Sequence, residues 1–119
     1  MSKNYLLIYS EQLATEIELL CQNIKASSNT LFQIRKSSSS VYANIREANY
    51  GQSKADFISK MHIALKETAE TEYWLKLLIM SEYITEDMGK SLLDDCMEIK
   101  RILVASINTA KASQAKDKT

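Results

Sequence analysis

The chain has 119 residues, which leaves room for one domain with one hydrophobic core. Its 15 lysines and arginines are balanced by 15 aspartates and glutamates, so it lacks the basic excess of a dedicated non-specific nucleic-acid binder. No apolar run approaches the roughly 20 residues that a membrane span needs. The absence of proline and the presence of only two glycines remove most helix breakers and favour long helices.

The N-terminal segment and the cysteines bear on the compartment of the protein. Residues 5–9 form the only apolar run near the start, and this run is too short for the core of a signal peptide. Cys21 and Cys96 lie far apart, lack metal-ligand spacing and fall among apolar residues. We therefore expect buried, reduced thiols rather than a disulfide or a site. Together these features predict a cytoplasmic protein that does not span a membrane.

The first predicted helix covers residues 4–25. Its apolar residues recur at spacings of three and four, which places them on one helical stripe. They are Leu6, Tyr9, Leu13, Ile17, Leu20 and Ile24. The polar run 26–29 predicts a loop whose serine or asparagine caps the next helix.

The second predicted helix covers residues 30–50 and includes four consecutive serines at positions 37–40. Serine competes for backbone hydrogen bonds, so this run alone would suggest a linker. The heptad phase nevertheless continues unbroken between Ile34 and Val41. We therefore expect one helix with a narrow waist of small residues, which a neighbouring helix can approach closely. Gly51 is expected to end this helix in the left-handed C′ conformation.

The third predicted helix covers residues 53–81 and starts at a capping-box-like segment, 53–56, in which Asp56 replaces the usual glutamate. Its apolar stripe includes Glu72, and we expect this carboxylate to pair with an arginine or tyrosine of another helix. A second apolar set lies beside the stripe, which is more than one buried face requires and predicts an oligomer interface. The interface candidates are Phe57, Tyr73, Trp74 and Leu77.

The fourth predicted helix covers residues 85–112, with Thr85 as its N-cap and two acids in its first turn. Three apolar residues flank its main stripe, and with the second set of the third helix they exceed what one bundle needs and favour self-association. They are Leu93, Met97 and Val104. Residues 113–119 are expected to form a polar, frayed tail. Because four helices joined by short loops pack antiparallel, we predict a single all-α domain over residues 1–119, an up-down-up-down four-helix bundle.

The catalytic signatures of helical bundles are missing from the sequence. Di-iron carboxylate proteins need Glu-x-x-His repeats, whereas the residue three before the only histidine, His62, is Ser59. No glycine-rich phosphate loop is present, because Gly51 and Gly89 are the only glycines. We therefore expect a protein that is not an enzyme and holds no metal or other cofactor. The alternative is an enzyme whose site forms at subunit junctions around His62 and Glu72.

Five cations of the second and third predicted helices form a candidate nucleic-acid-binding site. Arg35 and Arg46 are eleven residues apart and so lie on nearly the same helical face, with Tyr42 and Tyr50 interleaved. Such a face can contact a phosphate backbone, and repetition around a ring would add avidity. A solvated or salt-bridged face is the alternative interpretation. The five candidates are Arg35, Lys36, Arg46, Lys54 and Lys60.

Several segments resemble a known family of four-helix bundle proteins. Residues 32–37 (FQIRKS) and 43–48 (ANIREA) resemble the second helix of the proteins encoded in 23S rRNA intervening sequences, also called the S23 ribosomal protein family. Residues 53–61 (SKADFISKM), 63–67 (IALKE) and 70–75 (ETEYWL) are similar to its long third helix. The family often has glycine at the position that Glu82 occupies here.

The resemblance implies an up-down bundle that assembles into a ring, typically a homopentamer. A markedly basic relative, the accessory protein of diversity-generating retroelements, binds a reverse transcriptase and nucleic acid. The function that we expect is a non-enzymatic, homo-oligomeric adaptor for RNA or protein. The alternatives are an accessory subunit of a reverse transcriptase and the enzyme with a site at subunit junctions.

Overall fold

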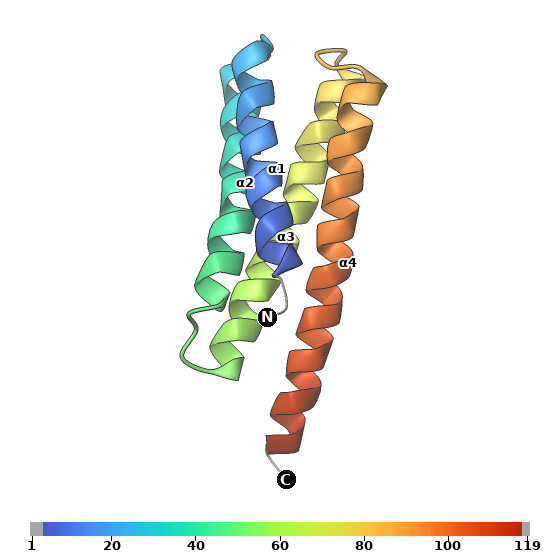
Figure 1. The fold of residues 1–119 in the computed structure, drawn as a ribbon. Coiled ribbons are helices and arrows are strands. Elements are labelled where there is room, and N and C mark those ends of the chain that lie inside the picture. The colour runs from blue at the N-terminus through green and yellow to red at the C-terminus, as the bar shows by residue number, and fades with distance from the viewer. Residues whose placement is uncertain (1–3, 118–119) are drawn as a thin grey trace.

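A computed structural model describes residues 4–117 and folds them into four helices without a strand among those residues. The helices are α1 (Tyr5–Asn23), α2 (Ser28–Ala48), α3 (Lys54–Met80) and α4 (Glu86–Asp117). Figure 1 shows that they run alternately up and down, with the α1–α2 hairpin beside the α3–α4 hairpin. The chain is therefore an all-α four-helix bundle, as predicted. None of the described helices is long and apolar enough to cross a membrane.

Each helix begins at a side chain that caps its first turn. The side-chain oxygens of Asn4, Ser27, Ser53 and Thr85 each accept a hydrogen bond, at 3.0 to 3.1 Å, from the backbone N–H three residues later. These bonds satisfy amides that have no partner within the helix. The sequence had marked three of these caps, in the run 26–29, at residue 53 and at residue 85. Local polar chemistry thus sets where the helices start.

The four serines at positions 37–40 lie within α2, so the prediction of one continuous helix is confirmed. Ser37 and Ser38 are buried, and each donates its hydroxyl to the carbonyl of Ile34, at 3.2 and 2.9 Å. Thr71 of α3 approaches closely enough to donate a hydrogen bond to Ser37. The small side chains therefore form the expected narrow waist against α3.

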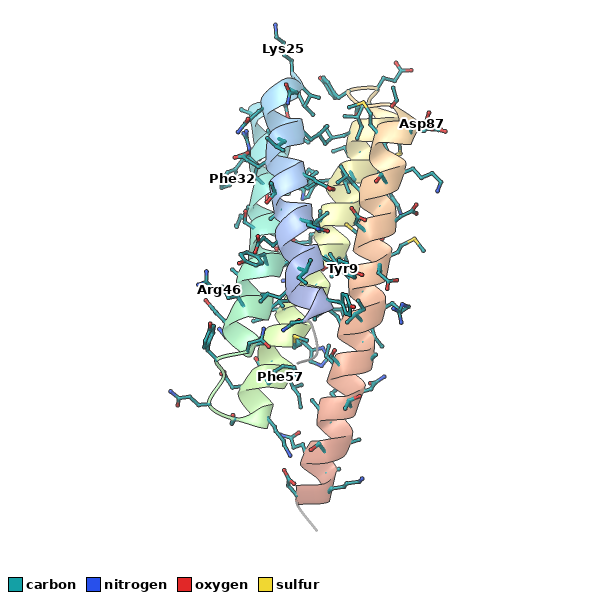
Figure 2. The ribbon with its side chains drawn as sticks, viewed as in Figure 1. Tyr9, Lys25, Phe32, Arg46, Phe57 and Asp87 are labelled. Carbon is teal, nitrogen blue, oxygen red and sulfur yellow. The ribbon has the colours of Figure 1, made fainter. Side chains whose placement is uncertain are left out.

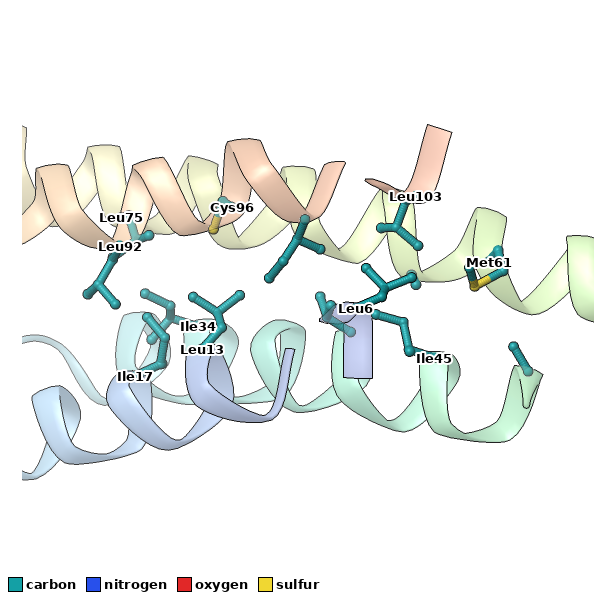
Figure 3. Close-up of a cluster of buried hydrophobic side chains, with 14 of the residues drawn as sticks. Leu6, Leu13, Ile17, Ile34, Ile45, Met61, Leu75, Leu92, Cys96 and Leu103 are labelled. Atoms are coloured by element: carbon teal, nitrogen blue, oxygen red, sulfur yellow. The ribbon is translucent and has the colours of Figure 1, made fainter. Parts of the chain in front are cut away.

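One hydrophobic core runs between the two hairpins, and Figure 3 shows residues from all four helices meeting in it. Fully buried members include Leu13 of α1, Ile34 of α2, Leu75 of α3 and Leu103 of α4. Burying each such side chain stabilises the fold by about 1.5–3 kcal/mol relative to leaving it exposed. The packing of these stripes, rather than helix propensity, holds the bundle together.

Both cysteines lie in this core, and they are not joined by a disulfide. Burial raises the pKa of the Cys96 thiol to about 12. Burial is also the main cause of the raised pKa of Cys21. Since the thiolate is the reactive form, both thiols are suited to a packing role, as predicted.

The buried face of α3 is rotated relative to the predicted stripe. Thr71 is buried, whereas Glu72 lies at the edge of the core with its side chain 13% exposed. Glu72 pairs with Lys100 of α4 at 2.8 Å, so the expectation of an arginine or tyrosine partner is wrong. At the edge of the core a long lysine side chain can reach the carboxylate while its ammonium group stays partly hydrated.

Two predictions about helix ends are wrong. Gly51 does not adopt a positive φ, and α2 ends earlier, at Ala48. The only positive φ of a non-glycine residue in the described part of the chain is that of Glu82, at 63°. The N–H of Glu82 bonds to the carbonyl of Ile79 and that of Tyr83 to the carbonyl of Leu78, which together form a Schellman motif at the end of α3.

The predicted polar tail is the second error, because α4 continues through residues 113–117. Lys54 at the start of α3 donates a hydrogen bond to Ser113 at 2.7 Å and forms an ion pair with Asp117. These contacts fasten the last turns of α4 to the rest of the bundle. Positions 118–119 of that tail lie outside the described residues, and the other predicted helix ends differ from the observed ones by one or two residues.

Candidate functional site

The five predicted cations are spread over three places on the bundle. Arg35 lies on α2 and forms an ion pair with Glu18 of α1, with Nε 2.6 Å from the carboxylate. Lys36 lies beside it, with its ammonium 6.0 Å from the centre of the Phe32 ring. Lys54 contacts the end of α4, as described above. Arg35 therefore links α2 to α1, and Lys54 links α3 to α4.

Arg46 of α2 and Lys60 of α3 are the two candidates that the structure brings together from different helices. They line an open groove of about 960 Å³ between the end of α2 and the start of α3. Glu47 lies 3.0 Å from Lys60 and raises the pKa of this lysine. Arg46 is exposed and forms no ion pair with any described residue. Figure 2 shows Arg46 on the flank of α2, far from Lys25 at the opposite end of the bundle.

Polar and aromatic side chains complete this groove. Tyr50 follows the end of α2 and is 78% exposed, so its ring contributes little to the core. Tyr42 lies two turns earlier and donates a hydrogen bond to Glu11 of α1 at 3.2 Å. Gln52 and Ser53 of the connecting loop also line the groove. The arrangement offers one unpaired guanidinium beside an accessible aromatic ring.

The predicted interface residues are only partly on the surface. Tyr73 is 56% exposed, and its ring meets that of Trp74 edge to face with their centres 4.8 Å apart. Trp74 and Leu77 are half-buried. Phe57 is half-buried as well and packs against the core at the other end of α3, where it lines an open groove of about 510 Å³ between α3 and α4.

Three further apolar residues of α3 and α4 are exposed, of which Met97 and Val104 belong to the flanking set of the fourth predicted helix and Met80 was not singled out by the sequence. Met97 and Val104 of α4 are 62% and 44% exposed, and Met80 of α3 is 72% exposed. The ion pair between Glu72 and Lys100 joins the two helices within one turn of both Tyr73 and Met97. We call Tyr73, Met80, Met97 and Val104 the α3–α4 outer face. The spacing of seven between Met97 and Val104, off the core stripe, is the sequence signal for it.

Two carboxylates oppose each other between α1 and α4. Burial raises the pKa of Glu16, and the nearby charge of Asp95 raises it further. Burial also raises the pKa of Asp95. No described cation forms an ion pair with either residue. The raised pKa values mean that ionising both carboxyl groups is less favourable in the folded protein than in the unfolded chain.

His62 and Glu72 do not form a site within one chain. Both lie on α3 ten residues apart, which separates them by about 15 Å along the helix axis. His62 is exposed, whereas Glu72 is already paired with Lys100. Among the described residues, no group of three or more histidine, cysteine, aspartate and glutamate side chains is arranged to hold a metal ion.

The sequence model of the 23S rRNA-intervening sequence proteins matches residues 6–105. The chain belongs to the 23S rRNA-intervening sequence protein family. A similar family structure is that of a protein with unknown function from the S23 ribosomal protein family of Bacteroides thetaiotaomicron VPI-5482. It is 44% identical in sequence, covers 86% of this chain and 97% of its own, and superimposes with a TM-score of 0.83. No curated protein matches the chain.

The residues matched by the 23S rRNA-intervening sequence family include the whole α3–α4 outer face. They also include the groove that Arg46 and Lys60 line. Both surfaces therefore belong to the family domain rather than to an added segment.

Proposed function

We propose that this protein is a non-enzymatic, homo-oligomeric adaptor that binds a protein or RNA partner. The observation that carries the proposal is the α3–α4 outer face, where Tyr73 and Met97 expose apolar surface on two adjacent helices. Contiguous exposed apolar surface often marks an interface. Aromatic and methionine side chains are enriched in such interfaces, and methionine adapts its shape to a partner.

The expected assembly is a ring, with five copies as the number that the family resemblance implies. In such a ring each copy contributes the same weak binding surface, so a partner that contacts several copies gains avidity. The cytoplasm is the proposed location, because two buried cysteines that are not joined by a disulfide suit a reducing compartment.

The mass in solution tests the assembly. Light scattering should give a multiple of the 13.5 kDa of one copy. Tyr73→Ser combined with Met97→Ser should reduce this mass, because both changes remove apolar area from the proposed interface. Phe32→Ser is the matched control, since Phe32 is equally exposed but lies on α2. A wild-type mass of one copy at micromolar concentration would contradict the proposal.

RNA is the nucleic-acid partner that the groove between α2 and α3 favours. Arg46 can contact a phosphate, and the exposed ring of Tyr50 can stack on an unpaired base. Arg46→Glu should weaken the binding of a labelled single-stranded RNA and reduce its salt dependence. Lys25→Glu is the control with the same charge change at the opposite end of the bundle. Equal loss in both variants would indicate non-specific attraction only.

A reverse transcriptase is the protein partner that the resemblance implies. Its co-purification with this chain, lost on Tyr73→Ser, would support the accessory-subunit alternative. The enzyme alternative needs His62, so a hydrolytic activity that disappears in His62→Ala would favour it over the adaptor.

A further inference from the structure

The outward face of α1 combines apolar and acidic side chains. Ile8 and Leu19 are eleven residues apart and therefore project from the same side of the helix, and both are exposed. Three glutamates flank them, and α1 contains no lysine or arginine. The glutamates are Glu11 and Glu18 on the side of α2, and Glu16 on the side of α4. We call Ile8, Leu19 and these glutamates the α1 outer face.

The α3–α4 outer face has the opposite charge. By helical spacing and the α3–α4 register, five lysines surround its apolar residues, against three acids. The lysines are Lys66, Lys76, Lys90, Lys100 and Lys111, and the acids are Glu70, Glu72 and Asp94. Glu72 and Asp94 are already paired with lysines of the same face, at 2.8 and 3.1 Å. Lys66, Lys76 and Lys111 are exposed and form no ion pair with a described carboxylate, and the charge of Lys66 acts on the neighbouring Glu67.

These two faces lie on different sides of the bundle, since α1 belongs to one hairpin and α3 and α4 form the other (Figure 1). We infer that copies of this chain associate head to tail, with the α1 outer face of one copy packed on the α3–α4 outer face of the next. This inference rests on the proposed homo-oligomer and names its two surfaces. The occupant is a second copy because both faces expose apolar area and their charges are complementary. Glu18 is already paired with Arg35 of α2, so Glu11 and Glu16 are the carboxylates that remain for the lysines of the next copy.

A symmetric dimer through one face is the competing arrangement. Pairing two α3–α4 outer faces would bring lysines of one copy against lysines of the other, and pairing two α1 outer faces would oppose glutamates. Like charges across an interface weaken binding and select against that pairing. A head-to-tail contact is heterologous, so it leaves one free face of each kind at the ends and grows until a ring closes.

Blocking each face separately tests this arrangement. Ile8→Arg with Leu19→Arg blocks only the α1 outer face, and Met97→Glu with Val104→Glu blocks only the α3–α4 outer face. All four residues are exposed, and circular dichroism checks that each variant folds. If a double variant unfolds, the single changes Leu19→Arg and Met97→Glu replace it. Light scattering then measures each variant alone and the two mixed in equal amounts.

We expect each variant alone to remain at the 13.5 kDa of one copy. The mixture should form a complex of twice that mass and grow no further, because only one intact α1 outer face can meet one intact α3–α4 outer face. An α1-blocked variant that retains the wild-type mass, or a mixture that stays at one copy, would overturn the head-to-tail contact while the homo-oligomer proposal stands. A wild-type protein of one copy would overturn both.

Discussion

The hydroxyl of Thr71 on α3 lies 2.9 Å from the hydroxyl of Ser37 on α2 and donates a hydrogen bond to it. The contact sits in the middle of the serine run, where both residues are buried. The two helices can approach this closely only because α2 carries small side chains at positions 37 and 38. The serine run is therefore a packing device and not a linker.

Replacing a small side chain between α2 and α3 by a larger one should destabilise the bundle. Ser37→Leu adds a side chain that has no space between α2 and α3, and it removes one of the two acceptors of the Thr71 hydroxyl, the other being the carbonyl of Glu67. Overpacking of this kind costs about 1–3 kcal/mol of unfolding free energy. Denaturant unfolding measures the loss. Ser39→Leu is the matched control, because Ser39 is exposed and should change stability by less than about 0.5 kcal/mol. Equal effects of the two substitutions would contradict the close approach of the helices.

Glycine at position 82 should stabilise the protein. Glu82 holds a φ of 63°, a conformation that costs a residue with a Cβ atom about 1–2 kcal/mol. Glu82→Gly relieves this cost at the Schellman turn, so we expect a higher unfolding midpoint and a gain of about 1 kcal/mol. Ser81→Gly serves for comparison, since Ser81 has a φ of −86° and gains nothing from glycine. A lower midpoint for Glu82→Gly would show that the glutamate side chain makes a compensating contact.

The opposed carboxylates of Glu16 and Asp95 should make the contact between α1 and α4 sensitive to pH. Both folded-state pKa values lie above the ordinary values of 4.5 and 3.8, so the folded state binds protons more tightly than the unfolded state. The contribution of this pair to the unfolding free energy therefore rises as pH falls through the folded-state pKa values. It then levels off below the unfolded ones. Asp95→Asn should raise the thermal midpoint at pH 7 and reduce this dependence.

Asp94→Asn is the control for this substitution. Asp94 is exposed and pairs with Lys90, and its charge also raises the pKa of Asp95. Its removal loses the first interaction and relieves the second, so the midpoint should change little. If Asp95→Asn also lowered the midpoint, the two carboxylates would not repel each other in the folded protein.

Neither cysteine should react with a thiol reagent in the native state. Burial raises the pKa of Cys96 to about 12, which leaves almost no thiolate at neutral pH, and Cys21 is buried as well. An absorbance assay with a disulfide reagent should therefore detect no fast-reacting thiol in the folded protein. Both thiols should react after denaturation. Rapid modification of Cys21 in native buffer would indicate that α1 detaches from the bundle.

The candidate site could be anticipated only in part. The sequence identified Arg46, Lys60 and Tyr73 as surface residues with binding chemistry, because their types and spacing are local properties. The sequence did not distinguish Arg46 from Arg35, because both lie on nearly the same face of the second predicted helix. In the structure Arg46 is exposed without an ion pair to a described residue, whereas Arg35 is paired. Arg35 is engaged by Glu18 seventeen residues away, and such a contact depends on how α1 and α2 are rotated against each other.

The fold class was determined by the sequence itself. Apolar residues at spacings of three and four, an unbroken phase through the serine run and polar capping residues specify four helices, because each signal acts within a few residues of the chain. The tertiary structure alone decided which side chains pair between helices and where the left-handed turn falls. Lys54 holds the last turns of α4, Lys100 rather than an arginine meets Glu72, and the left-handed turn falls at Glu82 instead of Gly51. These outcomes depend on the rotation and register of packed helices, which many weak contacts fix together.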